Sequence, residues 1–121
     1  MRVLLDEDLA HVLRLHLPGH DVFTVAYVGW GGLKNGELLK TAEAGGFEVF
    51  VTGDQSMRYE QNLSGRKLAI VMLSAIEWRI IKDHMPKIAA AVDQATPGSL
   101  TRVACGVFVR RRKPAMGPGL S

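Results

Sequence analysis

The sequence predicts an α/β fold with a mainly parallel central sheet and helices on both of its faces. Short apolar runs typical of buried strands alternate with segments whose apolar residues recur at helical spacing. Strands separated by helices form βαβ units, in which the strands run parallel and the connections are right-handed. The chain has 121 residues, of which 47% are hydrophobic and 22% charged, as expected for one globular domain.

The first three elements are two strands and the helix between them. Residues 2–5 (RVLL) form an apolar run that ends abruptly at a carboxylate, which indicates a strand. Residues 9–17 place leucine and valine at helical spacing, and the Pro-Gly pair at 18–19 ends that helix. Residues 21–28 (DVFTVAYV) then read as the second strand.

The middle of the chain continues the alternation. A glycine-rich loop, GWGGLKN, is followed by a helix at 36–46, which two glycines end. Leu38, Leu39 and Ala42 are its expected inward residues. The third strand, 48–52 (EVFVT), is apolar enough to be buried, and residues 67–73 (KLAIVML) form the fourth.

The last third predicts a long helical segment and a final strand. In residues 75–95 one apolar stripe contains Ile81, Met85, Ile88 and Val92. Pro86 lies inside this segment, so we expect a kink or two abutting helices. A turn at TPGS leads into the last strand, residues 101–109.

The positive charge of the chain is concentrated in its tail. The formal net charge is +3, from 15 Lys and Arg against 12 Asp and Glu. Residues 110–113 (RRRK) supply four of these positive charges, which leaves residues 1–109 with a net charge of −1. We therefore expect a domain at 1–109 and a basic tail at 110–121. Such a tail can attract nucleic acid through phosphates, and the simpler alternative is a solvated terminus.

Cysteine content and hydropathy indicate a cytoplasmic protein that does not enter the membrane. Cys105 is the single cysteine, so we expect no internal disulfide and a buried, inert thiol. No apolar stretch approaches the roughly 20 residues that span a bilayer. The first ten residues, MRVLLDEDLA, lack the pattern of a signal peptide.

Carboxylates follow two strands of the predicted sheet. Asp6 comes directly after the first strand, and Asp54 follows the third. Parallel strands end at a common edge, and ligands bind beyond that edge, so we expect both residues there. Asp8 lies two residues after Asp6, and Glu37 lies in the first turn of the second helix. The fold would bring these four carboxylates together.

A cluster of four carboxylates predicts a metal site. Several negative charges within a few ångströms are costly unless a cation neutralises them or protons stay bound. Oxygen-only ligands suit Mg²⁺ or Mn²⁺, and such ions activate water for phosphodiester cleavage. The structural alternative is that Asp6 or Glu7 caps a helix, that Asp54 is a turn residue and that Glu37 is a solvated acid.

Several segments together resemble a known family. They are LLDEDL, GHDVFTV, GWGGLKNGELLKTA, VFVTGDQSMRYEQNL and AIVML. In order and spacing, over roughly residues 1–95, they are similar to bacterial PIN-like proteins of unknown function, which are related to VapC-type toxins. The resemblance implies a three-layer α/β/α sandwich and an Mg²⁺- or Mn²⁺-dependent ribonuclease. It assigns Asp6, Glu37 and Asp54 as the catalytic acids.

The chain departs from the pattern of this family at three positions. Ser56 stands where many relatives have a second Asp, and Asn35 stands where some have Asp. Asp8 occupies a place often held by Asn or Cys, so it is an added metal ligand or an acid near a helix start. Three or four acids are enough to hold one ion.

Three residues are candidates for substrate binding. Trp30 in the glycine-rich loop would stack on a base, Arg58 would contact phosphate, and Asn35 would supply a polar group beside the acids. Each has a simpler alternative, namely a packing anchor for Trp30, a solvated face for Arg58 and a surface cap for Asn35.

Three functions remain open on the sequence. The first is a metal-dependent nuclease that cuts RNA, as the toxin half of a toxin–antitoxin pair. The second is a catalytically inactive PIN-like module that binds RNA or a protein partner, which Ser56 favours. The third is a receiver domain with Asp54 as phosphoryl acceptor and Ser74 as hydroxyl, although no Lys ends its last strand. Partners would be RNA, an antitoxin protein or a second copy of the chain, without a membrane.

Overall fold

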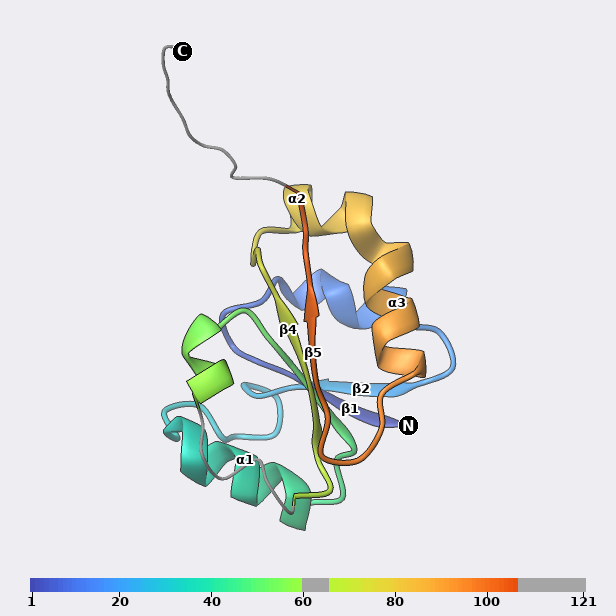
Figure 1. Cartoon of the computed structure of the whole chain (residues 1–121). Helices are drawn as coiled ribbons and strands as arrows, with labels where there is room; N and C mark the ends of the chain where they lie inside the picture. Colours follow the sequence, from blue (N-terminus) through green and yellow to red (C-terminus); the bar gives the residue numbers. More distant parts are fainter. Residues whose placement is uncertain (60–65, 107–121) are drawn as a thin grey trace.

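A computed structural model describes residues 1–59 and 66–106, and its centre is one five-stranded sheet (Figure 1). All neighbouring strands pair in parallel, in the order β2-β1-β3-β4-β5. The strands are β1 (Arg2–Leu5), β2 (Asp21–Thr24), β3 (Val49–Thr52), β4 (Ala69–Leu73) and β5 (Leu100–Val103). The predicted parallel sheet is therefore confirmed.

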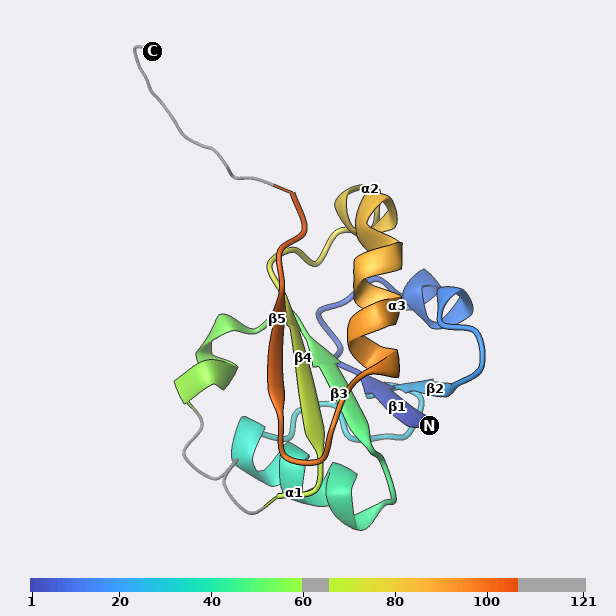
Figure 2. The same cartoon turned by 45° about the vertical axis from the view of Figure 1, so that its right-hand side comes forward.

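Helical segments cover both faces of this sheet (Figure 2). The segments are η1 (His11–His16), α1 (Asn35–Ala44), η2 (Gln55–Tyr59), α2 (Trp78–Ile81), η4 (Lys82–His84) and α3 (Met85–Asp93), where η marks a 3-10 helix. η1, α2 and α3 pack on one face, and α1 and η2 pack on the other.

Alternate residues of each central strand supply the two cores. In β1, Leu5 packs on the η1 and α3 face, whereas Leu4 packs on the α1 face. Every residue of β3 and β4 is buried, as expected for parallel strands covered on both sides. The sheet is thus a rigid support for whatever lies at its ends.

The connection between β4 and β5 differs in hand from the others. The connections into β3 and β4 move toward the β5 edge over the α1 face. The β4–β5 connection moves in the same direction, but α3 lies on the opposite face. The expectation of uniformly right-handed connections is therefore wrong. The physical reason is coverage, since α3 shields the part of this face over β4 and β5 that the short η1 leaves open.

The predicted helix at 9–17 and the strand at 21–28 are both shorter than expected. The helix is a 3-10 segment that starts at His11, and the N–H of Leu13 donates to the Ala10 carbonyl at 3.1 Å. β2 stops at Thr24, whose Oγ1 accepts a hydrogen bond from the Tyr27 N–H at 3.1 Å. A turn therefore replaces the second half of the predicted strand.

The predicted interruption near Pro86 is confirmed. α2 and η4 precede α3, and Pro86 occupies the first turn of α3, where its missing N–H is not needed. The predicted strand at 101–109 is observed at Leu100–Val103, and its last residues, like the basic tail at 110–121, lie outside the described residues. None of the helices in the described ranges is long and apolar enough to cross a membrane.

Candidate functional site

The carboxylates after β1 and β3 lie at the same edge of the sheet, as predicted. The two strands are neighbours, with Leu5 opposite Val51 in the register. The Asp6 N–H continues this pairing and donates to the Val51 carbonyl at 2.9 Å. In the order 2-1-3-4-5 the chain changes direction across the sheet between β1 and β3, and ligands of such sheets bind in the crevice at this point.

Asp6 is a buried carboxylate held by two donors. The residue is 9% exposed. The Thr52 hydroxyl donates to Asp6 Oδ2 at 2.6 Å, and the Glu7 N–H donates to Oδ1 at 2.8 Å. Burial raises the pKa of Asp6, although both hydrogen bonds oppose this effect, and the charges of Glu7 and Asp54 raise it further.

Asp8 lies in a turn that brings it back toward Asp6 and Asp54. The Leu9 N–H donates to the Asp6 carbonyl at 3.2 Å, which closes the turn. Partial burial raises the pKa of Asp8, and the charges of Asp6 and Asp54 add to this, while the Gly53 amide lowers it. The charges of both other aspartates thus act on Asp8 in the same direction as its burial.

The alternative that Asp6 or Glu7 caps a helix is wrong. The N-cap of η1 is Ala10, and no side chain caps that helix. The three acids occupy a separate turn before it, because the Asp6 carboxylate already accepts a hydrogen bond from the next residue and one from β3. The helix-cap alternative thus does not explain these acids.

The pKa of Asp54 is lowered, in contrast to those of Asp6 and Asp8. Ser56 donates to Asp54 Oδ1 twice, from Oγ at 2.7 Å and from N at 2.9 Å, and Asn35 Nδ2 donates to Oδ2 at 3.1 Å. The hydrogen bonds from the Ser56 and Asn35 side chains lower the pKa of Asp54, and the smaller effect of burial opposes them. Asp54 is a half-buried carboxylate whose ionised form these hydrogen bonds stabilise.

Thr52 connects the two strand exits. It is fully buried, and its hydroxyl donates to Asp6 while accepting a hydrogen bond from the Asp54 N–H at 3.0 Å. One hydroxyl group therefore fixes both aspartates. Sequence reasoning missed this residue, and the available signal was a polar residue in the last position of an otherwise apolar strand.

Gly53, directly after β3, lies close to Ile76 in the segment that follows β4. A Cβ at this position would lie 2.3 Å from Ile76 Cγ2 and 3.5 Å from Asp8 Oδ2. The Ile76 side chain would have to shift, whereas the distance to Asp8 is an ordinary van der Waals contact. This close approach was also not predicted from the sequence.

Glu37 is not joined to the other three acids by any hydrogen bond or ion pair found within residues 1–59 and 66–106. It lies exposed in the first turn of α1, and Asn35, at the start of the same helix, is the residue that reaches Asp54. Its assignment as a ligand stays a prediction.

The fit of a divalent cation rests on the chemistry of Asp6, Asp8 and Asp54. Their donors are all carboxylate oxygens, which suit Mg²⁺ or Mn²⁺. Burial and neighbouring charges raise the pKa values of Asp6 and Asp8. A bound cation would lower both values again, because it stabilises the ionised carboxylates. Across the described ranges, no three acidic, His or Cys side chains converge closely enough to hold a metal ion as they stand.

The remaining candidates lie in different surroundings. The Trp30 ring packs edge-on against Phe47, at 5.7 Å between centroids, and a Cβ on Gly45 would lie 3.0 Å from it. Its packing is thus explained, and base stacking stays a prediction. Arg58 belongs to η2, but its side chain lies outside the described part of the chain.

Comparison with models of protein families, with curated proteins and with solved structures finds no match in any of the three.

Proposed function

We propose that the protein is a metal-dependent nuclease with a PIN-like, three-layer fold, which hydrolyses RNA at the edge formed by Asp6, Asp8 and Asp54. The supporting observation is that the exits of β1 and β3 are neighbours and that the Thr52 hydroxyl joins them, donating to Asp6 and accepting from the Asp54 N–H. The sequence motifs that resemble PIN-like proteins give the direction of the proposal.

Each carboxylate has a distinct task in this proposal. Asp54 supplies an ionised ligand, since hydrogen bonds from Ser56 and Asn35 lower its pKa. Asp6 is a second ligand whose orientation Thr52 and the Glu7 amide fix. Asp8 is the most exposed of the three and completes the set. A bound Mg²⁺ or Mn²⁺ would activate water and stabilise the charge that develops at phosphorus.

The cleavage assay uses a labelled single-stranded RNA, Mn²⁺ or Mg²⁺, and the full chain. We expect cleavage that EDTA abolishes and that Asp6→Asn reduces at least 100-fold, because a direct ligand is lost. Asp83→Asn is the matched control, since Asp83 is an exposed acid of η4. Cleavage that survives EDTA, or that Asp83→Asn removes equally, would sink the proposal.

A catalytically inactive module is the alternative within the same fold. Ser56 supports it, since this residue donates to Asp54 instead of adding a carboxylate. RNA or protein binding without turnover, with all three aspartates intact, is the result expected for this alternative. An antitoxin partner or a homodimer is compatible with either function.

The receiver alternative is favoured by the strand order, because 2-1-3-4-5 is the order of one common class of doubly wound sheets that includes receivers. Asp54 follows β3 in such an arrangement, and Ser74 follows β4. However, the Ser74 hydroxyl accepts a hydrogen bond from the Cys105 N–H at 2.7 Å. Incubation with acetyl phosphate and mass spectrometry tests this function, and stable phosphorylation of Asp54 would replace the nuclease proposal.

A further inference from the structure

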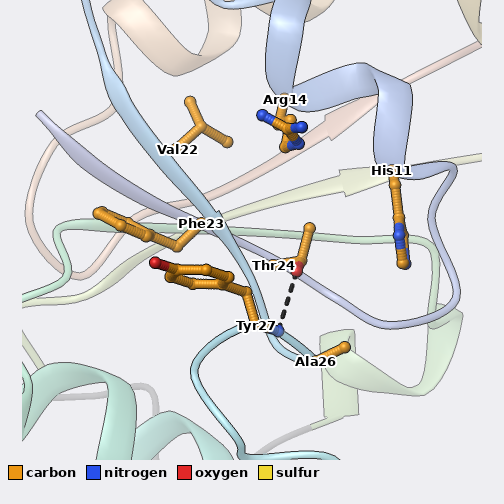
Figure 3. Close-up of a pocket in the computed structure, with 7 residues that line it drawn as sticks. All are labelled: His11, Arg14, Val22, Phe23, Thr24, Ala26 and Tyr27. Atoms are coloured by element: carbon orange, nitrogen blue, oxygen red, sulfur yellow. Dashed lines mark hydrogen bonds between the residues drawn. The ribbon is translucent and has the colours of Figure 1, made fainter.

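A cavity of about 600 Å³ lies along β2. This strand is at the edge of the sheet, beside β1 and on the opposite side of β1 from β3. It is lined by His11, Arg14, Val22, Phe23, Thr24, Ala26 and Tyr27. Figure 3 shows Phe23 and Tyr27 on one side of β2, while Arg14 and His11 project from η1 on the other. Its volume lies within the range of ordinary ligand sites, and no function considered so far uses it.

One side of the cavity is an aromatic platform. The rings of Phe23 and Tyr27 stack with 6.0 Å between centroids and 28° between planes. Phe23 is supported from behind by an edge contact with Phe47 and by the Arg2 guanidinium 5.2 Å from its centroid. Tyr27 is 78% exposed, although it is a large aromatic residue. A flat, supported and exposed ring of this kind is a stacking surface for a base.

The other side of the cavity favours an anion. Arg14 and His11 are exposed on η1, and none of the seven lining residues is acidic. The N–H groups of Asp21 and Val25 donate to β1 carbonyls, so those of Val22 and Thr24, one residue out of phase, point away from the sheet. The Arg14 guanidinium, the His11 imidazole and the outward N–H groups together suit a phosphate.

We propose that this cavity binds single-stranded RNA, with a base stacked on Tyr27 and a backbone phosphate at Arg14 and His11. The inference deepens the proposed nuclease function and rests on it for the choice of RNA. The register places Thr24 beside Leu5, so the carboxyl end of β2 adjoins the exit of β1 that carries Asp6. RNA held across the β2 edge is thereby anchored next to the carboxylates.

An extended peptide fits this edge less well. Strand addition needs a run of free backbone groups, whereas β2 has four residues and the carbonyl of Thr24 already accepts the Val28 N–H at 3.2 Å. The stacked aromatic pair would have no role in a backbone ladder. A bound RNA would use both the stacked aromatic pair and the side of the cavity that favours an anion.

The test is fluorescence anisotropy of a labelled single-stranded RNA with the full chain in EDTA, where no metal-dependent cleavage occurs. We expect Tyr27→Leu to weaken binding about tenfold and Tyr27→Phe to leave it within about twofold, because the ring supplies the stacking. Arg14→Gln should reduce the dependence of log K on log salt by about 0.7. Arg79→Gln, an exposed arginine on α2, is the matched charge control.

The outcomes separate this inference from the nuclease proposal. Loss of binding in Tyr27→Leu and Arg14→Gln but not in Arg79→Gln supports the cavity, even if no RNA is cleaved with metal. Binding that all variants retain, as expected if only the basic tail contacts RNA, overturns the cavity while cleavage by the aspartates can persist. Absence of RNA binding by the wild-type chain also overturns it. Tyr27 and Arg14 are exposed, so their substitution leaves the core intact.

Discussion

The exits of β1 and β3 present aspartates at one edge of one sheet, yet in opposite electrostatic states. At the β1 exit, burial and neighbouring charges raise the pKa of Asp6 and of Asp8. At the β3 exit, hydrogen bonds from Ser56 and Asn35 lower the pKa of Asp54. The difference teaches that the balance between burial and hydrogen-bond donors, more than position on the sheet, decides which carboxylate is stable as an anion: burial is the largest effect at Asp6 and Asp8, and donors are the largest at Asp54.

This contrast has consequences for stability that differ in sign. Asp54 stabilises the fold above the pKa it has in the unfolded chain, and this contribution is lost as the pH falls through its lower folded pKa. Asp6 and Asp8 bind protons more tightly when folded, so their ionisation costs stability as the pH rises through their raised folded pKa values. A bound cation would reduce the repulsion between Asp6 and Asp8 at the β1 exit. At the β3 exit, Asp54 would bind it in its ionised form.

Removal of the hydroxyl shared by both exits has the largest expected effect. Thr52→Val leaves the buried Asp6 carboxylate without its side-chain donor and the Asp54 N–H without its acceptor. We expect a loss of about 2 kcal/mol in the free energy of unfolding. Urea denaturation measures it at pH 7.

Thr52→Ser is the control for this substitution, since it keeps the hydroxyl and removes a methyl group at a cost of roughly 0.8 kcal/mol. If the valine variant is as stable as the serine variant, the two exits do not share this support.

A side chain at Gly53 would displace Ile76. The Cβ of Gly53→Ala would lie 2.3 Å from Ile76 Cγ2, so the Ile76 side chain must move. We expect a loss of about 1 kcal/mol, the low end for overpacked sites, because Ile76 is 43% exposed and can shift; denaturation measures it. Gly31→Ala is the control, because its nearest neighbour would be Glu7 Oε1 at 3.6 Å. Equal effects for the two glycines would argue against a close approach at Gly53.

Truncation of Asn35 should reduce the difference between the pKa of Asp54 and those of Asp6 and Asp8. Asn35→Ala removes a donor to Asp54, so the pKa of Asp54 should rise toward its usual value. We expect a loss of about 0.5–1 kcal/mol at pH 7, which shrinks in acid once Asp54 is protonated. Carboxyl NMR titration and denaturation at two pH values test this, with Gln94→Ala as an exposed amide control. A pKa that does not rise would count against the role of Asn35.

Neutralising Asp8 is expected to have the smallest effect, and it is stabilising. Asp8→Asn removes a charge close to Asp6 and Asp54. At pH 7 without divalent ions we expect a gain of about 0.5 kcal/mol, limited by solvent screening at this exposed residue. Thermal denaturation at low and high salt measures it, and the gain should decrease with salt. A destabilised variant at low salt would contradict charge crowding at the β1 exit.

The sequence could predict the sheet and the meeting of two strand exits, because apolar runs, helical spacing and terminal acids are local signals. It predicted less well what depends on packing. The length of β2 is set by a hydroxyl of Thr24 that turns the chain, and η1 is short because the acids before it form their own turn. The side of the sheet on which α3 packs depends on which face needs cover, and no local pattern encodes this.

In the candidate site, too, local sequence signals predicted some features, whereas others depend on packing. Asp6, Asp8 and Asp54 could be placed at one edge from topology alone. Thr52, which connects Asp6 and Asp54, acts through a buried hydroxyl, and Gly53 matters through the missing Cβ beside Ile76. The cavity beside Tyr27 depends on a turn that was expected to be strand.

Calorimetric titration of Mn²⁺ into the wild-type chain and into Asp54→Asn, at moderate salt and neutral pH, tests the central claim most directly. The two strand exits form one cation site in our account, so we expect saturable binding by the wild type and at least tenfold weaker binding by the variant. Wild-type protein that takes up no Mn²⁺, or a variant that binds equally well, would contradict it.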